Sequence, residues 1–168
     1  MNKHFSCLSF FLMLFCTSSL FAQDTAAQPV LKVSGEVSNP LSLPASVIAA
    51  MPHHTAVLND HSGHPRTYSG VYIQDILTRA GAAMGKELRG ENLDEYLLVK
   101  CADGYEVVFS LAELDSSFTS RPAILADSSE GKPLPETRGP FRLIIPGEKI
   151  PARSCFQVMD MIVRHAGD

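Results

Sequence analysis

The sequence has no cluster of basic residues, and its 14 Lys and Arg are outnumbered by 18 Asp and Glu, which gives a formal net charge of -4. Proteins that bind nucleic acid usually present a basic patch to the phosphate backbone, so this balance argues against nucleic acid as a partner. Internal repeats and low-complexity segments are also lacking. The length and composition therefore predict one globular domain.

No two of the four cysteines have the CxxC spacing of a redox or zinc motif. Cys7 and Cys16 fall in the N-terminal apolar segment, which leaves Cys101 and Cys155 in the rest of the chain. In an exported protein these two could form a disulfide. Each also lies in an apolar run, where a buried free thiol behaves as a small hydrophobic side chain. Both interpretations stay open.

The N-terminus has the pattern of a secretory signal peptide. Lys3 and His4 precede an uncharged, mostly apolar run at residues 5–21, and Ala22 offers a small residue for cleavage. A membrane anchor is the alternative, because the run is nearly long enough to span a bilayer, but residues 23–28 contain no Lys or Arg of a stop-transfer segment. We therefore expect a signal peptide at 1–22, a linker at 23–29 and one domain at 30–168. The protein would be periplasmic or secreted, with no stable membrane anchor after cleavage.

Short strand and helix patterns alternate along the domain, which predicts the α+β class. Strands are expected at 30–37, 53–59, 95–100, 106–110, 123–126 and 141–145, and helices at 43–51, 72–80 and 111–114. Asp103 and Gly104 predict the turn of a hairpin, and loops are expected at 60–66 and 131–139. Residues 154–164 fit a strand and a helix almost equally.

Four histidines fall within twelve residues, beside Asp60: His53, His54, His61 and His64. Imidazole is a good ligand for copper and zinc, so this cluster is a candidate metal site. The alternative is that these are solvated residues of a loop and a strand edge. In a strand, the adjacent His53 and His54 would point to opposite faces.

Four segments in order resemble the oxidoreductase molybdopterin-binding domain, the family of sulfite oxidase. They are VSGEVSNPLSLP at 33–44, YSGVYIQDILTRAG at 68–81, CADGYEVVFSLAEL at 101–114 and GKPLPETRGPFRLIIPGEK at 131–149. The resemblance implies a sulfite-oxidase-like fold with a mixed β-sheet, short helices and a pterin cleft. In active members, a molybdenum atom is held by one protein cysteine.

The cysteine that the resemblance requires is missing. Its neighbourhood reads AVLND at 56–60, and no cysteine occurs between Cys16 and Cys101. A thiolate is an anionic, soft ligand that Leu58 or Asn59 cannot replace. The basic, glycine-rich segments that hold the pterin phosphate in active members are also not evident. Both absences argue against ordinary sulfite-oxidase chemistry.

The resemblance nevertheless places several residues near the cleft. Asp103 and Tyr105 match a rim segment, although a turn residue and an aromatic packed at its base are the simpler explanation. Arg138 and Arg142 could bind an anion through a planar donor fork, or pair with a carboxylate. Cys101 lies at the beginning of the expected hairpin turn. The candidate cofactor-binding residues are Asn59, His61, Cys101, Asp103, Tyr105, Arg138 and Arg142.

Three hypotheses follow. The first is a cofactor-free or degenerate binding or accessory module whose partner is a small molecule or a periplasmic protein. The second is a molybdopterin-dependent oxidoreductase with an unusual ligand set that includes Cys101. The third is a copper or zinc protein built on the histidines. The sequence leaves open whether the chain is an enzyme.

Overall fold

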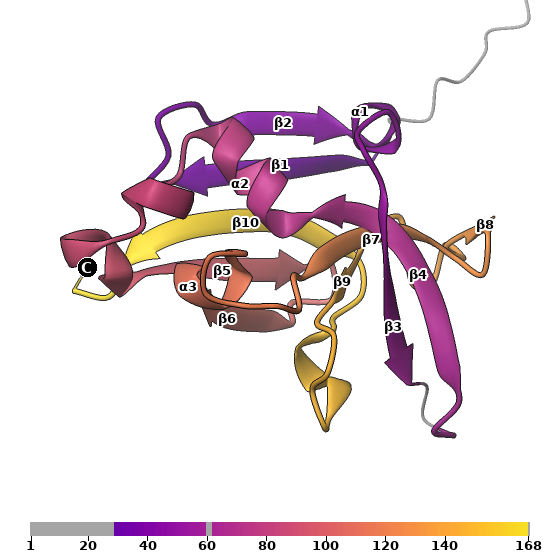
Figure 1. Ribbon diagram of the computed structural model, residues 1–168. Coiled ribbons are helices and arrows are strands. Elements are labelled where there is room, and N and C mark those ends of the chain that lie inside the picture. The colour runs from indigo at the N-terminus through magenta and orange to yellow at the C-terminus, as the bar shows by residue number, and fades with distance from the viewer. Residues whose placement is uncertain (1–28, 60–61, 168) are drawn as a thin grey trace, which may run out of the picture.

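Two five-stranded sheets make up most of the computed structural model, which describes residues 29–59 and 62–167 (Figure 1). Sheet A has the strand order β2 (Leu41–Pro44), β1 (Val30–Gly35), β10 (Val158–His165), β5 (Glu95–Cys101), β6 (Glu106–Ser110). Sheet B has the order β3 (His54–Asn59), β4 (Pro65–Tyr72), β7 (Ile124–Ser129), β8 (Lys132–Pro133), and β9 (Arg142–Ile144) also pairs with β7. Because β1 and β10 are parallel and the other pairs of sheet A are antiparallel, sheet A is mixed, as the sequence predicted.

The helices are short: α1 (Ala45–Ala49), α2 (Ile73–Ala80) and α3 (Leu111–Leu114), with single 3₁₀ turns η1 (Gly85–Glu87), η2 (Gly90–Asp94) and η3 (Pro151–Arg153). Helix α2 ends at Gly81, whose φ of 77° is the left-handed conformation that glycine adopts without strain. The predicted capping box at α3 is present, since Ser110 accepts from the Glu113 amide and Glu113 accepts from the Ser110 amide. Within the described ranges, no helix is long and apolar enough to cross a bilayer.

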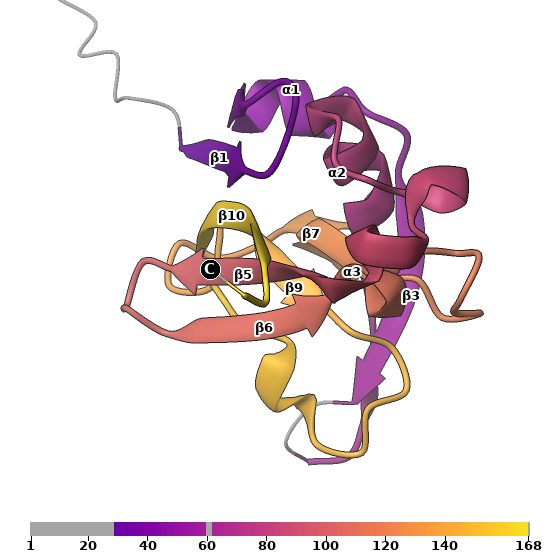
Figure 2. The same cartoon turned by 90° about the vertical axis from the view of Figure 1, so that its left-hand side faces the viewer.

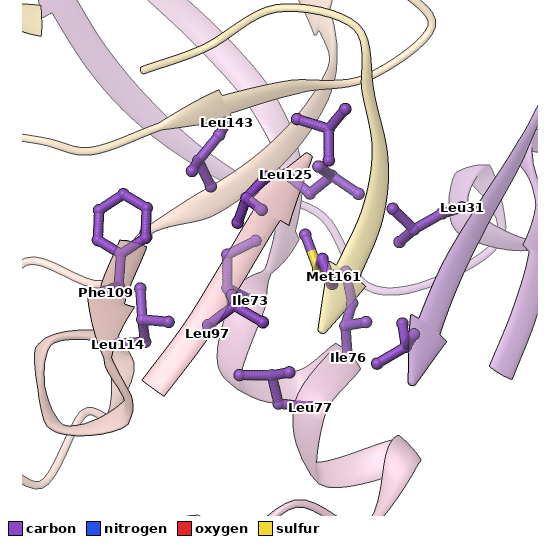
Figure 3. Packing of buried hydrophobic residues seen from close by; sticks show 14 of the residues in the cluster. Leu31, Ile73, Ile76, Leu77, Leu97, Phe109, Leu114, Leu125, Leu143 and Met161 are labelled. Atoms are coloured by element: carbon purple, nitrogen blue, oxygen red, sulfur yellow. The ribbon is translucent and has the colours of Figure 1, made fainter. Parts of the chain in front are cut away.

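The main core fills the space between the two sheets and α2 (Figure 3). Ile73, Ile76 and Leu77 of α2 are fully buried there, and they recur at the spacing of one helical face. A smaller cluster lies on the other face of sheet B. Along β7, Leu125 belongs to the main core and its neighbours Ile124 and Ala126 to the smaller cluster, which is the alternation expected of a strand.

Three local expectations need correction. Residues 43 and 44, expected to begin a helix, end β2 instead, because Leu43 and Pro44 pair with β1 and helix α1 starts only after Pro44. Residues 65 and 66, expected in a loop, begin β4, because they pair with Asn59 and Leu58. The ambiguous segment 154–164 becomes strand β10 from Val158 onward, since β1 and β5 pair with its two edges. The predicted signal peptide lies outside the described residues.

Candidate functional site

A cavity of about 430 Å³ lies where three distant parts of the chain meet. The β3–β4 hairpin, from sheet B, contributes Asn59, Arg66 and Tyr68, and the β5–β6 turn, from sheet A, contributes Asp103 and Tyr105. The remaining wall comes from Arg138, Arg142, Pro151, Ala152 and the segment 154–156. Figures 1 and 2 show the end of the β3–β4 hairpin and the loop that carries η3 projecting from the same side of the molecule. We call this space the arginine cavity.

Arg142, at the start of β9, is the most unusual side chain of the arginine cavity. It is only 8% exposed, although it carries a formal charge. Its Nη1 donates to the Tyr68 hydroxyl, its Nε donates to the Ser154 carbonyl at 3.4 Å, and its guanidinium carbon lies 4.0 Å from the centroid of the Phe156 ring. Burial, together with the charge of nearby Arg138, lowers the pKa of Arg142. The fold thus holds a poorly solvated cation against two aromatic rings.

The excess positive charge of the arginine cavity is not balanced by carboxylates. Arg138 lies over Phe156, with 5.3 Å between its guanidinium carbon and the ring centroid, and Arg66 lies on the exposed part of β4. Across the part of the chain that the structure describes, no ion pair joins Arg66, Arg138 or Arg142 to an acidic residue. Asp103 is the single acidic residue on the described wall. Such a site attracts an anion.

The β5–β6 turn forms the rim of the cavity. The Asp103 carboxylate accepts from the Tyr105 amide at 3.0 Å, which stabilises the turn, and the Tyr105 hydroxyl donates to the Ala152 carbonyl at 3.1 Å. The Tyr105 side chain remains 46% exposed. Both predicted rim residues therefore line the cavity, and Asp103 also has the structural role that was weighed for it.

The opposite wall is fixed by Arg153 of η3. Its Nε donates to Glu148 at 2.7 Å, and its Nη1 and Nη2 each donate to Glu113 of α3 at 3.1 Å. Its guanidinium carbon also lies 4.5 Å from the centroid of the Phe109 ring in β6. These contacts hold the 151–156 segment against sheet A, and so they hold the Ser154 carbonyl and the Phe156 ring that contact Arg142.

Two buried thiols lie next to this wall. Cys155 lines the arginine cavity, whereas Cys101, at the end of β5, does not. Both cysteines are free and buried. Hydrogen bonding to Cys155 lowers the pKa of Cys101, while the same interaction and burial raise the pKa of Cys155 well above its usual range. The pair can therefore hold one negative charge, mainly on Cys101.

The described histidines of the candidate cluster, His53, His54 and His64, do not converge on one metal site. In the β3–β4 register, His54 lies opposite Gly70 and Asn59 opposite Pro65. His53 and His54 are therefore near one end of the hairpin and His64 is near the other. At the rise per residue of a β-strand, the two ends are on the order of 17 Å apart. His53 contacts Asp127 and the Met51 carbonyl, and the His54 ring stacks on Tyr72 with 3.7 Å between centroids. His61 lies outside the described residues.

A copper or zinc site is therefore not supported, since the described ranges contain no group of three His, Cys, Asp or Glu side chains placed to hold a metal ion. The physical reason is the extended conformation of β3, which separates residues that are close in sequence. The sequence spacing alone could not indicate this separation, because a loop would have allowed the same residues to meet.

The structure brings together five of the seven candidate cofactor-binding residues: Asn59, Asp103, Tyr105, Arg138 and Arg142. It also adds residues that sequence reasoning missed, namely Arg66, Tyr68, Cys155 and Phe156. The rings of Tyr68 and Phe156 carried no signal of a site, because a strand aromatic usually packs in a core. No single basic, glycine-rich segment for a pterin phosphate was evident in the sequence. The arginines of the cavity come instead from β4, from β9 and from the loop before β9.

Comparison with known proteins gives two findings. The family model described as "Oxidoreductase molybdopterin binding domain" matches residues 59–163. No curated protein matches the sequence.

Among solved structures, the chain is similar to the sulfane dehydrogenase SoxCD from Paracoccus pantotrophus, with a TM-score of 0.64 and 17% sequence identity. The similarity covers 83% of this chain and 39% of that one, so the chain spans well under half of the longer protein. At this identity the match concerns the fold. The family match and the structural similarity together confirm the predicted sulfite-oxidase-like α+β fold.

Proposed function

Because the chain belongs to the oxidoreductase molybdopterin-binding domain family, we propose that it is an exported binding or accessory module that takes an anionic, ring-containing ligand of the pterin phosphate class. One observation carries this proposal. Arg142 is nine-tenths buried beside the arginine cavity, between Tyr68 and Phe156, with no carboxylate partner in the described ranges. An unpaired buried cation is costly unless a ligand supplies the missing charge.

The arginine cavity fits the organic part of such a ligand. Guanidinium groups donate to phosphate in a planar fork, and Arg66, Arg138 and Arg142 all line the space. Tyr105 offers an exposed aromatic ring at the rim, on which a flat heterocycle can stack. The backbone of residues 151–156 closes the opposite side.

The cavity does not fit a molybdenum atom held by a thiolate. Asn59, at the end of β3 where the family's cysteine is expected, offers a neutral amide. Of the two described thiols, Cys101 does not line the cavity, and Cys155 lines it from the segment after η3 rather than from the end of β3, where the family's cysteine is expected. We therefore assign no reaction step to the metal.

Elemental analysis tests the absence of a metal centre. The full chain would be purified from a host that makes the molybdenum cofactor, and its molybdenum content compared with that of an active family member made in the same host. We expect far less than one molybdenum atom per chain. A stoichiometric amount would support instead the rival hypothesis of an oxidoreductase with an unusual ligand set.

Ligand titration tests the binding site. A phosphorylated pterin reports its own binding through fluorescence, and we expect a Kd on the order of micromolar. Arg142→Met should raise that Kd roughly 30-fold, which corresponds to about 2 kcal/mol for charge-assisted hydrogen bonds. Arg79→Met, on the exposed face of α2, is the matched control and should bind like the wild type. Equal affinities of the two variants would refute the assignment of Arg142.

Export remains a proposal based on residues 1–22. Expression of the full chain in a bacterium, followed by cell fractionation and N-terminal sequencing, should place the protein outside the cytoplasm with Gln23 as its first residue. An uncleaved protein in the membrane fraction would favour the anchor interpretation.

A further inference from the structure

Cys101 ends β5 of sheet A, and Cys155 is hydrogen-bonded to β9 of sheet B, so backbone contacts of both sheets position the two residues. Cys101 pairs with Val158 at the start of β10, and the next residue, Ala102, donates its amide to the Gln157 carbonyl at 3.0 Å. Cys155 is three residues before Val158, and its carbonyl accepts from the Leu143 amide at 2.9 Å. Backbone contacts on both sides thus fix the two residues whose side chains interact.

We propose that Cys101 and Cys155 are a redox-active dithiol, which low-molecular-weight disulfides convert reversibly to an intramolecular disulfide. The site differs from the ligand-binding function above, because it requires only the two thiols and a small disulfide. Cys155 gives such a reagent access, since its side chain lines the arginine cavity although the residue is only 5% exposed.

The chemistry needs one thiolate in the pair. The hydrogen bond between the sulfurs stabilises a negative charge on Cys101 and keeps the remaining proton on Cys155. Because Cys155 lines the arginine cavity, a small disulfide in that cavity lies next to the pair. A buried pair of this kind is more reactive than an isolated buried thiol, which stays protonated.

The reaction is a two-step thiol-disulfide exchange. The protein thiolate attacks one sulfur of the reagent, a mixed disulfide forms, and the first reagent thiolate leaves. The second protein cysteine, after losing its proton, attacks the protein sulfur of the mixed disulfide and releases the second reagent thiolate. Two electrons pass from the protein to the reagent disulfide, one released thiolate takes up the single proton of the second cysteine, and the other leaves as a thiolate that equilibrates with solvent.

Oxidation would act on the arginine cavity, because Cys155 lies between two residues that contact Arg142. The carbonyl of Ser154 accepts from Arg142, and the ring of Phe156 packs on it. Pulling the Cys155 side chain into a covalent bond with Cys101 shifts this segment. We therefore expect different amide hydrogen exchange in residues 142–144 and 154–158 between the reduced and oxidised proteins.

The test uses the folded full chain, equilibrated in buffers with different ratios of reduced to oxidised glutathione and then treated with an alkylating reagent. Peptide mapping by mass spectrometry identifies the linkage and separates it from Cys7 and Cys16. We expect a Cys101–Cys155 linked peptide whose amount rises and falls with the glutathione ratio. Alkylation of both cysteines at every ratio, mixed disulfides alone, or a linkage that resists reduction would each overturn the proposal.

Single variants provide the second readout. In Cys101→Ala and Cys155→Ala the remaining cysteine has no partner, so oxidised glutathione should produce a stable mixed disulfide in place of the intramolecular link. Cys101 in the Cys155→Ala variant should also react several-fold more slowly with a small disulfide at pH 7, because it has lost the hydrogen bond that stabilises its thiolate. An unchanged rate would contradict the shared charge, and the wild-type experiment decides the linkage even if a variant does not fold.

Discussion

Gly70 lies at a close approach of β4 and β7. A Cβ atom at this position would be 2.0 Å from the Leu125 carbonyl oxygen and 2.5 Å from the Ala126 Cα, both of which are backbone atoms. The pairing of β4 with β7 is also irregular between Ser69 and Gly70. The close approach explains why the segment that resembles the family motif contains glycine here rather than a strand-forming residue.

We predict that Gly70→Ala destabilises the protein by about 3 kcal/mol or more, because the strands must separate to admit the methyl group. The measurement is urea unfolding followed by circular dichroism. Gly167→Ala is the control, since a Cβ there meets no atom within 4 Å, and it should change the free energy of unfolding by less than about 0.5 kcal/mol. Similar unfolding midpoints for the two variants would contradict the packing argument.

At the scale of single residues, sequence reasoning found some cavity residues and missed others for a physical reason. Asp103 and Tyr105 could be placed because an Asp-Gly turn fixes the local geometry of a hairpin. Tyr68 could not, because its role comes from Arg142, 74 residues later in the chain. Contacts at such separation depend on how the sheets pack, which no local pattern encodes.

His53 links the segment before β3 to strand β7 of sheet B. Its Nε2 contacts the Asp127 carboxylate at 2.8 Å, and its Nδ1 contacts the Met51 carbonyl at 2.7 Å. Although partial burial opposes it, the hydrogen bonds to Asp127 and Met51 raise the pKa of His53 above its ordinary value of 6.5. The folded state therefore binds a proton at this position more tightly than the unfolded state.

This contact should make stability depend on pH in a defined direction. A raised folded-state pKa stabilises the protein fully below about pH 6.5, and the contribution is lost as the pH rises through the folded-state pKa. We predict that His53→Gln costs about 0.5–1 kcal/mol at pH 5.5 and less at pH 8.5. The measurement is the free energy of unfolding of both proteins at the two pH values.

Asp127→Asn provides the control for that prediction, because it removes the carboxylate and leaves the histidine. In this background, His53→Gln should have nearly the same effect at both pH values. The pair His165–Asp94 also titrates, but it is present in every protein compared and cancels in the difference. A cost of His53→Gln that grows with pH would contradict the argument.

At the scale of elements, the predictable parts were those with a local signal. Helix α2 followed from its apolar spacing and Gly81, and α3 followed from its capping box. Residues 43 and 44 were misassigned to a helix because their strand exists only through pairing with β1. The choice between strand and helix for β10 was likewise decided by two neighbouring strands, β1 and β5, that are distant in sequence.

For the whole molecule, the arginine cavity matters because it joins the two sheets at their surface. Tyr68 belongs to sheet B, Asp103 and Tyr105 to a turn of sheet A, and residues 151–156 connect β9 to β10. The family resemblance predicted this architecture. It did not predict that an excess of arginine would accompany the missing cysteine, because the three arginines lie in separate segments.

A ligand that bridges both sheets should stabilise the whole domain. At a phosphorylated pterin concentration of 100 times the Kd, binding adds about 2.7 kcal/mol, which corresponds to a rise in Tm of roughly 5–10 °C for a domain of this size. Arg142→Met should show little or no ligand-induced rise in Tm.

Without ligand, the free energy of unfolding of Arg142→Met should be within about 1 kcal/mol of the wild-type value, because the lost hydrogen bonds are offset by removal of a buried charge. Differential scanning calorimetry measures both effects. A variant that keeps the full ligand-induced rise would show that the stabilisation does not depend on Arg142, and a large loss of stability without ligand would indicate that this arginine serves the fold instead.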